Sequence, residues 1–201
     1  MLLLAGTAAS ARRYRVVRYV EDAKGHLYLK FSFHAFFDRR LRRELTKGFQ
    51  KVILVEARVY RAGRSRPVAI SVRTCKVIYD LWAGSFLITI DDASGTRKVR
   101  VNTLERAVRE ITGVQLYLGP ASRYPRRRGG HGGMFYADVV IQFAPLPPGF
   151  LRKIRRWLRN PLGPASKGGS PLGSRFSLFV NPRISRALKE WRFRTQKFYR
   201  P

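Results

Sequence analysis

The sequence predicts an α+β fold, mostly antiparallel β-sheet or a β-sandwich, with two or three short helices. Short runs of alternating apolar and polar residues recur along the chain between turn-forming residues, which is typical of antiparallel strands. Helical spacing of apolar residues is confined to a few short stretches. The chain has 201 residues, 45% of them hydrophobic, which is enough for one domain with its own core. We expect that domain over residues 12–201.

The expected strands are bounded by Gly, Pro, Asn, Asp and Ser, residues that favour turns. They lie at residues 14–20, 26–33, 52–61, 67–81, 86–90, 99–101, 114–118, 134–144, 176–180 and 191–199. One hairpin loop is expected at 91–95, with Asp91 and Asp92 in Asx turns. Longer, flexible loops are expected near 120–133 and 160–174.

Three short segments have the apolar spacing of a helix. The first follows Asp38, its expected N-cap, and ends at Gly48. The second spans 103–112, with Asn102 as its expected cap. The third spans 149–159 and opens after two prolines.

Residues 1–11 are predicted to be a truncated signal peptide. A short apolar run is followed by Ala9-Ser10-Ala11, the small-x-small pattern of a signal peptidase site, and no positively charged segment precedes it. Cleavage would place the protein in the periplasm or outside the cell. If the leader is instead not a signal, the protein stays in the cytoplasm. No other stretch approaches the ~20 apolar residues of a membrane span.

Charge is the strongest indication of function. The chain has 41 Lys and Arg against 12 Asp and Glu, a net charge of +29 that attracts anionic partners. An Arg cluster in the loop near 120–133 and the polar face of the helix at 149–159 are the expected contacts, with Trp157 as interfacial anchor. The predicted anion-binding residues are Arg126, Arg127, Arg128, Arg152, Lys153, Arg155, Arg156, Arg159 and Trp157.

The helix after Asp38 has a similar basic face. That face consists of Arg39, Arg40, Arg42, Arg43 and Lys47. For both basic helices, packing of the apolar stripe against the sheet with solvated cations outside is the simpler interpretation. The alternative is that they build one basic surface for an anionic membrane interface.

Basic and aromatic residues also alternate near the two ends of the chain, at Arg18-Tyr19, 191–194 and 197–200. This alternation suits the stacking of single-stranded bases with neutralised phosphates. It equally results from strands whose apolar residues point inward and whose basic residues point outward. The sequence favours the second interpretation.

No arrangement of residues indicates catalysis, a metal or a cofactor, and the chain is predicted not to be an enzyme. The three histidines have no second ligand at a metal-binding spacing. Cys75 is the single cysteine and is expected to be a small buried strand residue. Asp138 is expected to form a cross-strand ion pair, and Asp80 to pair with a nearby Arg.

Four blocks of residues resemble an uncharacterised bacterial family. The blocks are 72–82, 155–158, 176–181 and 192–196. They are similar to domain of unknown function 4390, a family of secreted proteobacterial proteins with myxobacterial members. The resemblance covers nearly the whole chain from about residue 12 and implies an envelope location. It implies no activity and no site.

The sequence therefore predicts a non-enzymatic bacterial envelope protein, periplasmic or secreted. Its basic face is expected to bind an anionic surface such as lipid head groups or an acidic polymer. Two alternatives stay open: a cytoplasmic nucleic-acid-binding module, and a scaffold that binds an acidic protein.

Overall fold

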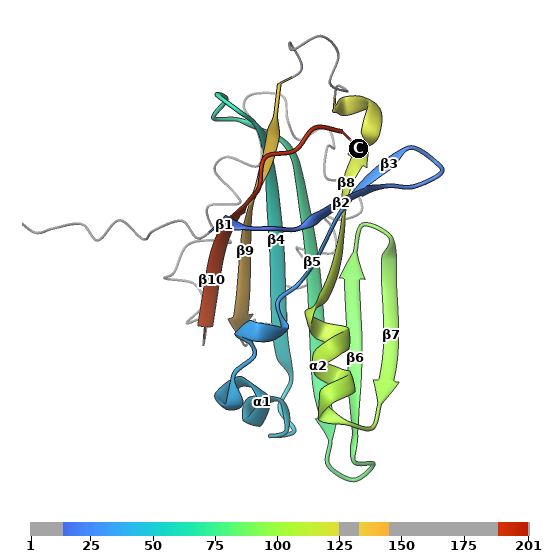
Figure 1. Ribbon diagram of the computed structural model, residues 1–201. Helices are drawn as coiled ribbons and strands as arrows, with labels where there is room; N and C mark the ends of the chain where they lie inside the picture. The colour runs from blue at the N-terminus through green and yellow to red at the C-terminus, as the bar shows by residue number, and fades with distance from the viewer. Residues whose placement is uncertain (1–13, 125–132, 145–188, 201) are drawn as a thin grey trace, which may run out of the picture.

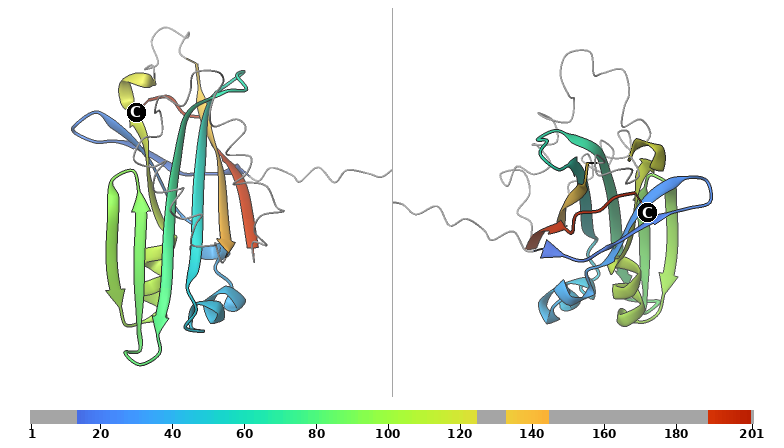
Figure 2. Two further views of the ribbon diagram at one scale, coloured as in Figure 1. Left: turned by 180° about the vertical axis from the view of Figure 1, so that it is seen from behind. Right: turned by 45° about the horizontal axis from the view of Figure 1, so that its top comes forward.

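The computed structural model describes residues 14–124, 133–144 and 189–200. These residues form two β-sheets, which are mostly antiparallel, together with two α-helices and two short 3-10 turns (Figure 1). The predicted α+β class with antiparallel sheet is confirmed. The small sheet and the second helix lie on the same face of the large sheet, and the first helix lies at its lower end (Figure 2).

The large sheet has seven strands in the order β1-β10-β9-β4-β5-β6-β7. The bounds are β1 Tyr14–Arg15, β10 Lys189–Thr195, β9 Phe135–Ala144, β4 Lys51–Arg61, β5 Pro67–Asp80, β6 Ser85–Asp92 and β7 Gly95–Val101. All neighbours are antiparallel except β1, which runs parallel to β10. Strands from both ends of the chain therefore meet at one edge of this sheet.

The small sheet consists of β2 (Arg18–Glu21), β3 (His26–Ser32) and β8 (Gly113–Pro120), all antiparallel. The single strand predicted over 14–20 is wrong, because its two halves, β1 and β2, belong to different sheets. Between them, Val17 donates to the side-chain oxygen of Gln196 (2.9 Å), and the Gln196 amide donates back to the Val17 carbonyl (2.6 Å). These two hydrogen bonds hold the chain where it leaves the large sheet.

Helix α1 (Arg39–Leu45) begins as predicted, because the Asp38 carboxylate accepts a hydrogen bond from the Leu41 N–H at 2.9 Å. The chain then turns at Gly48, whose φ of +73° favours glycine. Helix α2 spans Leu104–Thr112, and the predicted residue at its N-cap is wrong.

Its N-cap is Thr103 and not Asn102, because the Thr103 hydroxyl accepts from the Arg106 N–H at 3.3 Å. The 3-10 turns are η1 (His34–Phe36) and η2 (Ala121–Arg123).

The hairpin between β6 and β7 is tighter than the predicted loop at 91–95. Strand β6 continues through Asp92, so Asp91 is a buried strand residue and not a turn residue. Its carboxylate accepts from the Thr96 hydroxyl at 2.6 Å and lies 3.7 Å from the Lys76 ammonium. Asp92 forms the expected Asx turn by accepting from the Ser94 N–H at 2.8 Å.

One apolar core lies between the sheets and helices. The inward face of β9 was predicted correctly and is buried: Phe135, Ala137, Val139, Ile141 and Phe143. Leu41 and Leu45 bring α1 to this core, and Val108 and Ile111 bring α2. Packing of these apolar stripes places both helices toward the same end of the large sheet (Figure 1).

Several predicted elements lie outside the described residues. They are the leader at 1–11, the loop from 125 to 132, the helix at 149–159, the loop at 160–174 and the strand at 176–180. Within the described part of the chain, no helix is long and apolar enough to cross a membrane.

Candidate functional site

The residues predicted to bind an anion lie outside the described ranges. These are Arg126, Arg127, Arg128, Arg152, Lys153, Arg155, Arg156, Arg159 and Trp157. The candidate site therefore consists of other residues. The distribution of charge over the described part of the chain indicates which ones.

The fold uses every carboxylate of the protein. All 12 acidic residues lie in the described ranges, and each has a hydrogen-bond or ion-pair partner there. Asp138 confirms its predicted role, because it accepts two hydrogen bonds from Arg194, at 2.7 and 2.9 Å. The predicted pairing of Asp80 with an Arg is wrong. Its carboxylate instead accepts from the backbone N–H groups of Trp82 (3.1 Å) and Ala83 (3.0 Å). Because cations greatly outnumber carboxylates, most of the Lys and Arg side chains cannot be neutralised by an ion pair within the chain.

Helix α1 holds three such cations, which we call the basic rim: Arg39, Arg40 and Arg43. All three are exposed, and none has an ion-pair partner among the described residues. The other two cations of the predicted face are engaged, Arg42 with Glu105 and Lys47 with Glu44. Arg39, Arg42 and Arg43 line a hollow of about 400 Å³.

Two of the three rim cations, Arg39 and Arg40, do not stabilise the helix that carries them, whereas Arg43 lies in its last turn, where the dipole favours a cation. Arg39 and Arg40 occupy the first turn of α1, where the helix dipole favours negative charge, and that turn contains no acidic residue. Arg39 and Arg43 are four residues apart, so two like charges lie on one side of the helix. The presence of Arg39 and Arg40 in the first turn therefore has an explanation other than the stability of α1.

Three exposed apolar side chains lie on the segment after α1 and in the turn after β5, and we call them the apolar tip: Phe49, Leu81 and Trp82. Their exposed fractions are 72%, 61% and 96%. Leu81 and Trp82 occupy the turn between β5 and β6, and a Cβ on Gly48 would lie only 3.1 Å from Leu81 Cδ1. The segment after α1 and the β5–β6 turn are therefore in contact.

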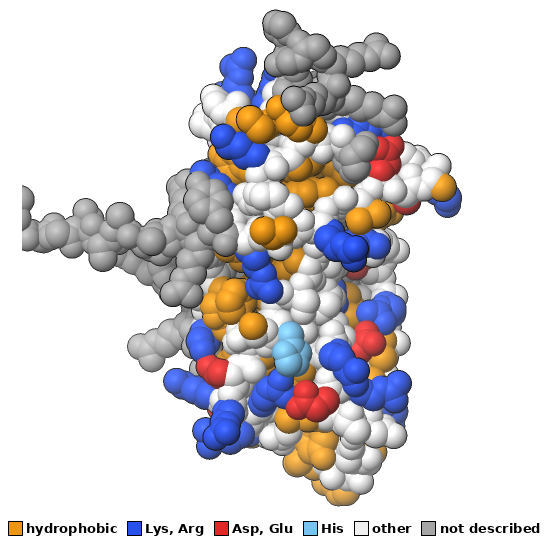
Figure 3. Space-filling model, viewed as in Figure 1, with side chains coloured by type: hydrophobic (Ala, Val, Ile, Leu, Met, Phe, Trp, Pro, Cys, Tyr) orange, Lys and Arg blue, Asp and Glu red, His pale blue; other side chains and the backbone are white. Residues whose placement is uncertain are grey.

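Tip and rim together form one end of the molecule. Hydrophobic side chains gather at the lower end of the space-filling view, with Lys and Arg on both sides above them (Figure 3). Five large hydrophobic side chains are exposed in the described ranges. Phe49, Leu81 and Trp82 form the tip, Ile78 lies near the end of β5 just before it, and Val16 alone lies elsewhere. The tip was missed by sequence reasoning. Two large apolar residues in a hairpin turn were the signal that could have indicated it.

The C-terminal alternation of basic and aromatic residues is structural. Phe193 and Phe198 are buried in the core, while Arg192 pairs with Glu190 and Arg200 with Glu21. This arrangement confirms the strand with apolar residues inward and basic residues outward. Buried rings cannot stack with nucleic-acid bases.

Cys75 is buried, as predicted, and burial raises the pKa of its thiol to about 12. Such a thiol stays protonated at neutral pH and is a poor nucleophile. The described residues contain no group of three or more His, Cys, Asp or Glu side chains that could hold a metal ion.

Comparison of the chain with protein-family models, curated proteins and solved structures returns no match. The resemblance to a secreted family therefore stays a prediction. The tip and the rim are the candidate functional site.

Proposed function

We propose that this protein binds anionic membrane surfaces as a peripheral protein, through the apolar tip and the basic rim. One observation carries the proposal: Trp82, the most exposed of the tip side chains at 96%, lies with Leu81 in a turn at the same end of the large sheet as α1, whose rim cations have no ion-pair partner in the described residues. Side chains of this kind insert at the headgroup boundary while cations contact anionic lipid.

The expected magnitudes are sufficient for reversible attachment. Each rim cation contributes about 1 kcal/mol near an anionic leaflet, so the three contribute on the order of 3 kcal/mol. Each tip side chain contributes up to about 1.5–3 kcal/mol if it is fully removed from water. Because 1.4 kcal/mol is a factor of ten in affinity, loss of either group should be easy to measure.

A lipid surface fits these residues better than a nucleic acid or an acidic polymer does. The aliphatic side chain of Leu81 gains nothing from contact with a solvated polyanion but is stabilised in an acyl-chain environment. Leu81 and Trp82 also lie in a turn, where exposed side chains can enter a lipid surface.

Vesicle flotation tests the proposal directly. The protein should float with phosphatidylcholine vesicles that contain phosphatidylglycerol and should stay behind with pure phosphatidylcholine. The double variant Leu81→Ser/Trp82→Ser and the double variant Arg39→Gln/Arg43→Gln should each bind at least tenfold more weakly. Arg64→Gln/Arg66→Gln is the matched control, because it removes two exposed charges from the β4–β5 hairpin at the other end of β4 and β5.

Equal binding to neutral and anionic vesicles would overturn the proposal. So would an equal loss of binding in the rim variant and in the matched control, because net charge alone would then explain attachment. If a single-stranded oligonucleotide binds tightly and the tip variant loses that binding while it keeps its vesicle binding, the partner is nucleic acid.

A further inference from the structure

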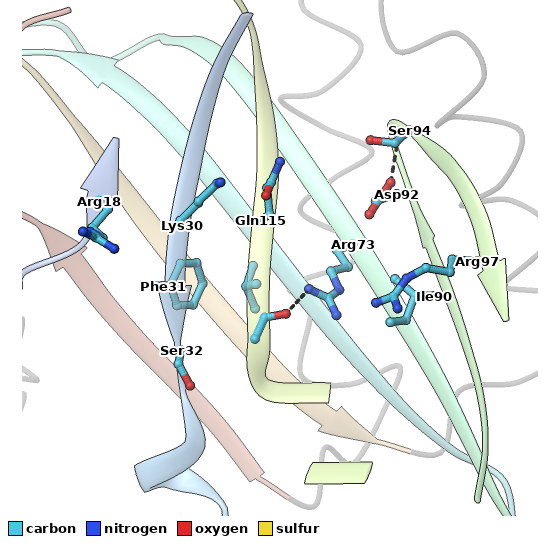
Figure 4. Close-up of a pocket in the computed structure, with 12 residues that line it drawn as sticks. Arg18, Lys30, Phe31, Ser32, Arg73, Ile90, Asp92, Ser94, Arg97 and Gln115 are labelled. Atoms are coloured by element: carbon cyan, nitrogen blue, oxygen red, sulfur yellow. Dashed lines mark hydrogen bonds between the residues drawn. The ribbon is translucent and has the colours of Figure 1, made fainter. Parts of the chain in front are cut away.

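A pocket with a volume of about 640 Å³ lies between the two sheets, away from the tip (Figure 4). Strands β2 and β3 line one side, β5, β6 and β7 line the other, and the start of β8 lies between them. The tip precedes β6, whereas Ile90, the pocket residue of that strand nearest to it, lies five residues beyond Ser85, so roughly 17 Å of strand separates the two sites. A test of the pocket is thus independent of the proposed membrane contact.

Two cations line the β2–β3 side of the pocket. Arg18 and Lys30 are directly opposite each other in the antiparallel register, and both line the pocket. Like charges at opposed strand positions destabilise a sheet. Neither side chain has an ion-pair partner among the residues that the structure describes, so no carboxylate in that part of the chain offsets the repulsion.

A third cation, Arg73, approaches from β5 and is only 4% exposed. Its guanidinium donates to the carbonyl oxygens of Gly113 and, at 2.9 Å, of Glu110, both near the C-terminal end of α2. Its Nε is buried without a partner in the described structure. Burial disfavours the charged form of Arg73 and lowers its pKa. Its direct hydrogen-bond partners are neutral carbonyl groups, which carry no opposite charge.

The fourth cation, Arg97, extends from β7 toward Arg73 in Figure 4. It forms an exposed ion pair with Glu110, with both terminal nitrogens 3.1 Å from the Glu110 Oε2. Among the described residues that line the pocket, Asp92 is the only carboxylate, and one of its oxygens already accepts from the Ser94 N–H. Four cations from four strands therefore face a pocket with one carboxylate.

We propose that this pocket binds a phosphate ester. A phosphate monoester carries about −1.5 to −2 charges and has three strong acceptor oxygens, which suits cations that converge from several strands. The hydroxyl groups of Ser32 and Ser94 and the amide of Gln115 supply further donors at the lining.

The volume of the pocket and its apolar lining residues fit an organic phosphate ester better than a bare phosphate ion. A volume of about 640 Å³ lies within the range of small-molecule sites. Phe31, Ile90 and Val114 line it beside the polar groups and can contact the organic part of the ligand. The ester can be a soluble metabolite or a lipid headgroup, and both have the same phosphate chemistry.

The test compares three probes at constant ionic strength by calorimetric titration: uridine diphosphate, a short-chain phosphatidic acid below its micelle concentration, and citrate. The two phosphate probes should bind, and citrate should bind at least tenfold more weakly. Tighter binding of uridine diphosphate identifies a soluble ester, and tighter binding of phosphatidic acid identifies a lipid headgroup.

The variant Arg18→Gln/Lys30→Gln should bind both phosphate probes at least tenfold more weakly. Its unliganded melting temperature should not fall, because the substitution removes two like charges from opposed strand positions and breaks no ion pair of the described residues. Arg64→Gln/Arg66→Gln and the tip variant should keep the affinity of the unmodified protein. Equal binding of citrate, or an equal loss of affinity in the pocket variant and the matched control, would overturn the proposal.

Discussion

At the scale of single residues, Arg40 is a side chain whose charge destabilises the start of its own helix. It is exposed in the first turn of α1, where the helix dipole favours an acidic side chain. We predict that Arg40→Glu raises the free energy of unfolding by about 0.5–1 kcal/mol and weakens binding to anionic vesicles. Urea denaturation and flotation measure the two effects on the same sample.

Arg40→Gln is the control for this prediction, and it should show about half of each effect because it removes one charge instead of reversing it. Lower stability of Arg40→Glu, or unchanged vesicle binding, would show that Arg40 serves the fold and not a partner. Opposite signs for stability and binding are expected where a residue is kept for function.

At the scale of elements, Glu44 joins the end of α1 to the start of β4. It accepts from Lys47 at 2.5 Å and from Lys51 at 2.9 Å, and these bonds, with that of Lys47 the larger influence, lower its pKa to about 2. Because the unfolded chain binds this proton more tightly, the stabilisation is present above about pH 4.5 and is lost as pH falls toward 2.

We predict that Glu44→Gln reduces the dependence of stability on pH in the window between about pH 4.5 and 2. Urea denaturation at a series of pH values measures the slope. Lys47→Gln removes the larger of the two influences and should give an intermediate slope. An unchanged slope in both variants would mean that the other carboxylates account for the acid sensitivity.

At the scale of the whole molecule, Thr195 connects parts of the chain that are far apart in sequence. Its hydroxyl oxygen accepts from the buried Ala137 N–H at 2.8 Å and lies 2.7 Å from the Tyr19 hydroxyl. Burial raises the pKa of Tyr19, so that phenol stays protonated over the physiological range. One hydroxyl thereby links β2 of the small sheet to β9 and β10 of the large sheet.

We predict that Thr195→Val lowers the free energy of unfolding by about 1–3 kcal/mol, because the Ala137 N–H is left buried without an acceptor. Thr195→Ser keeps the hydroxyl and should lose less. Thermal and urea denaturation give the comparison. Equal losses in the two variants would assign the effect to packing of the methyl group and not to the hydrogen bonds.

Features of the fold that depend on local sequence could be predicted. The alternation along β9, the cap at Asp38 and the antiparallel class follow from residues within one or two turns or a single strand. The cap of α2 was misplaced by one residue, because Asn102 and Thr103 have similar capping chemistry and only the backbone geometry selects Thr103.

The sequence by itself determined a basic chain with short alternating strands, and hence an antiparallel α+β protein that attracts anions. Only the tertiary structure decided which cations stay unneutralised and where they meet. The contact of Gly48 with Leu81 brings the segment after α1 to the β5–β6 turn, and the register of Arg18 with Lys30 forms one side of the pocket. Such arrangements come from pairings between distant segments, and the core selects those pairings by burying one face of each strand.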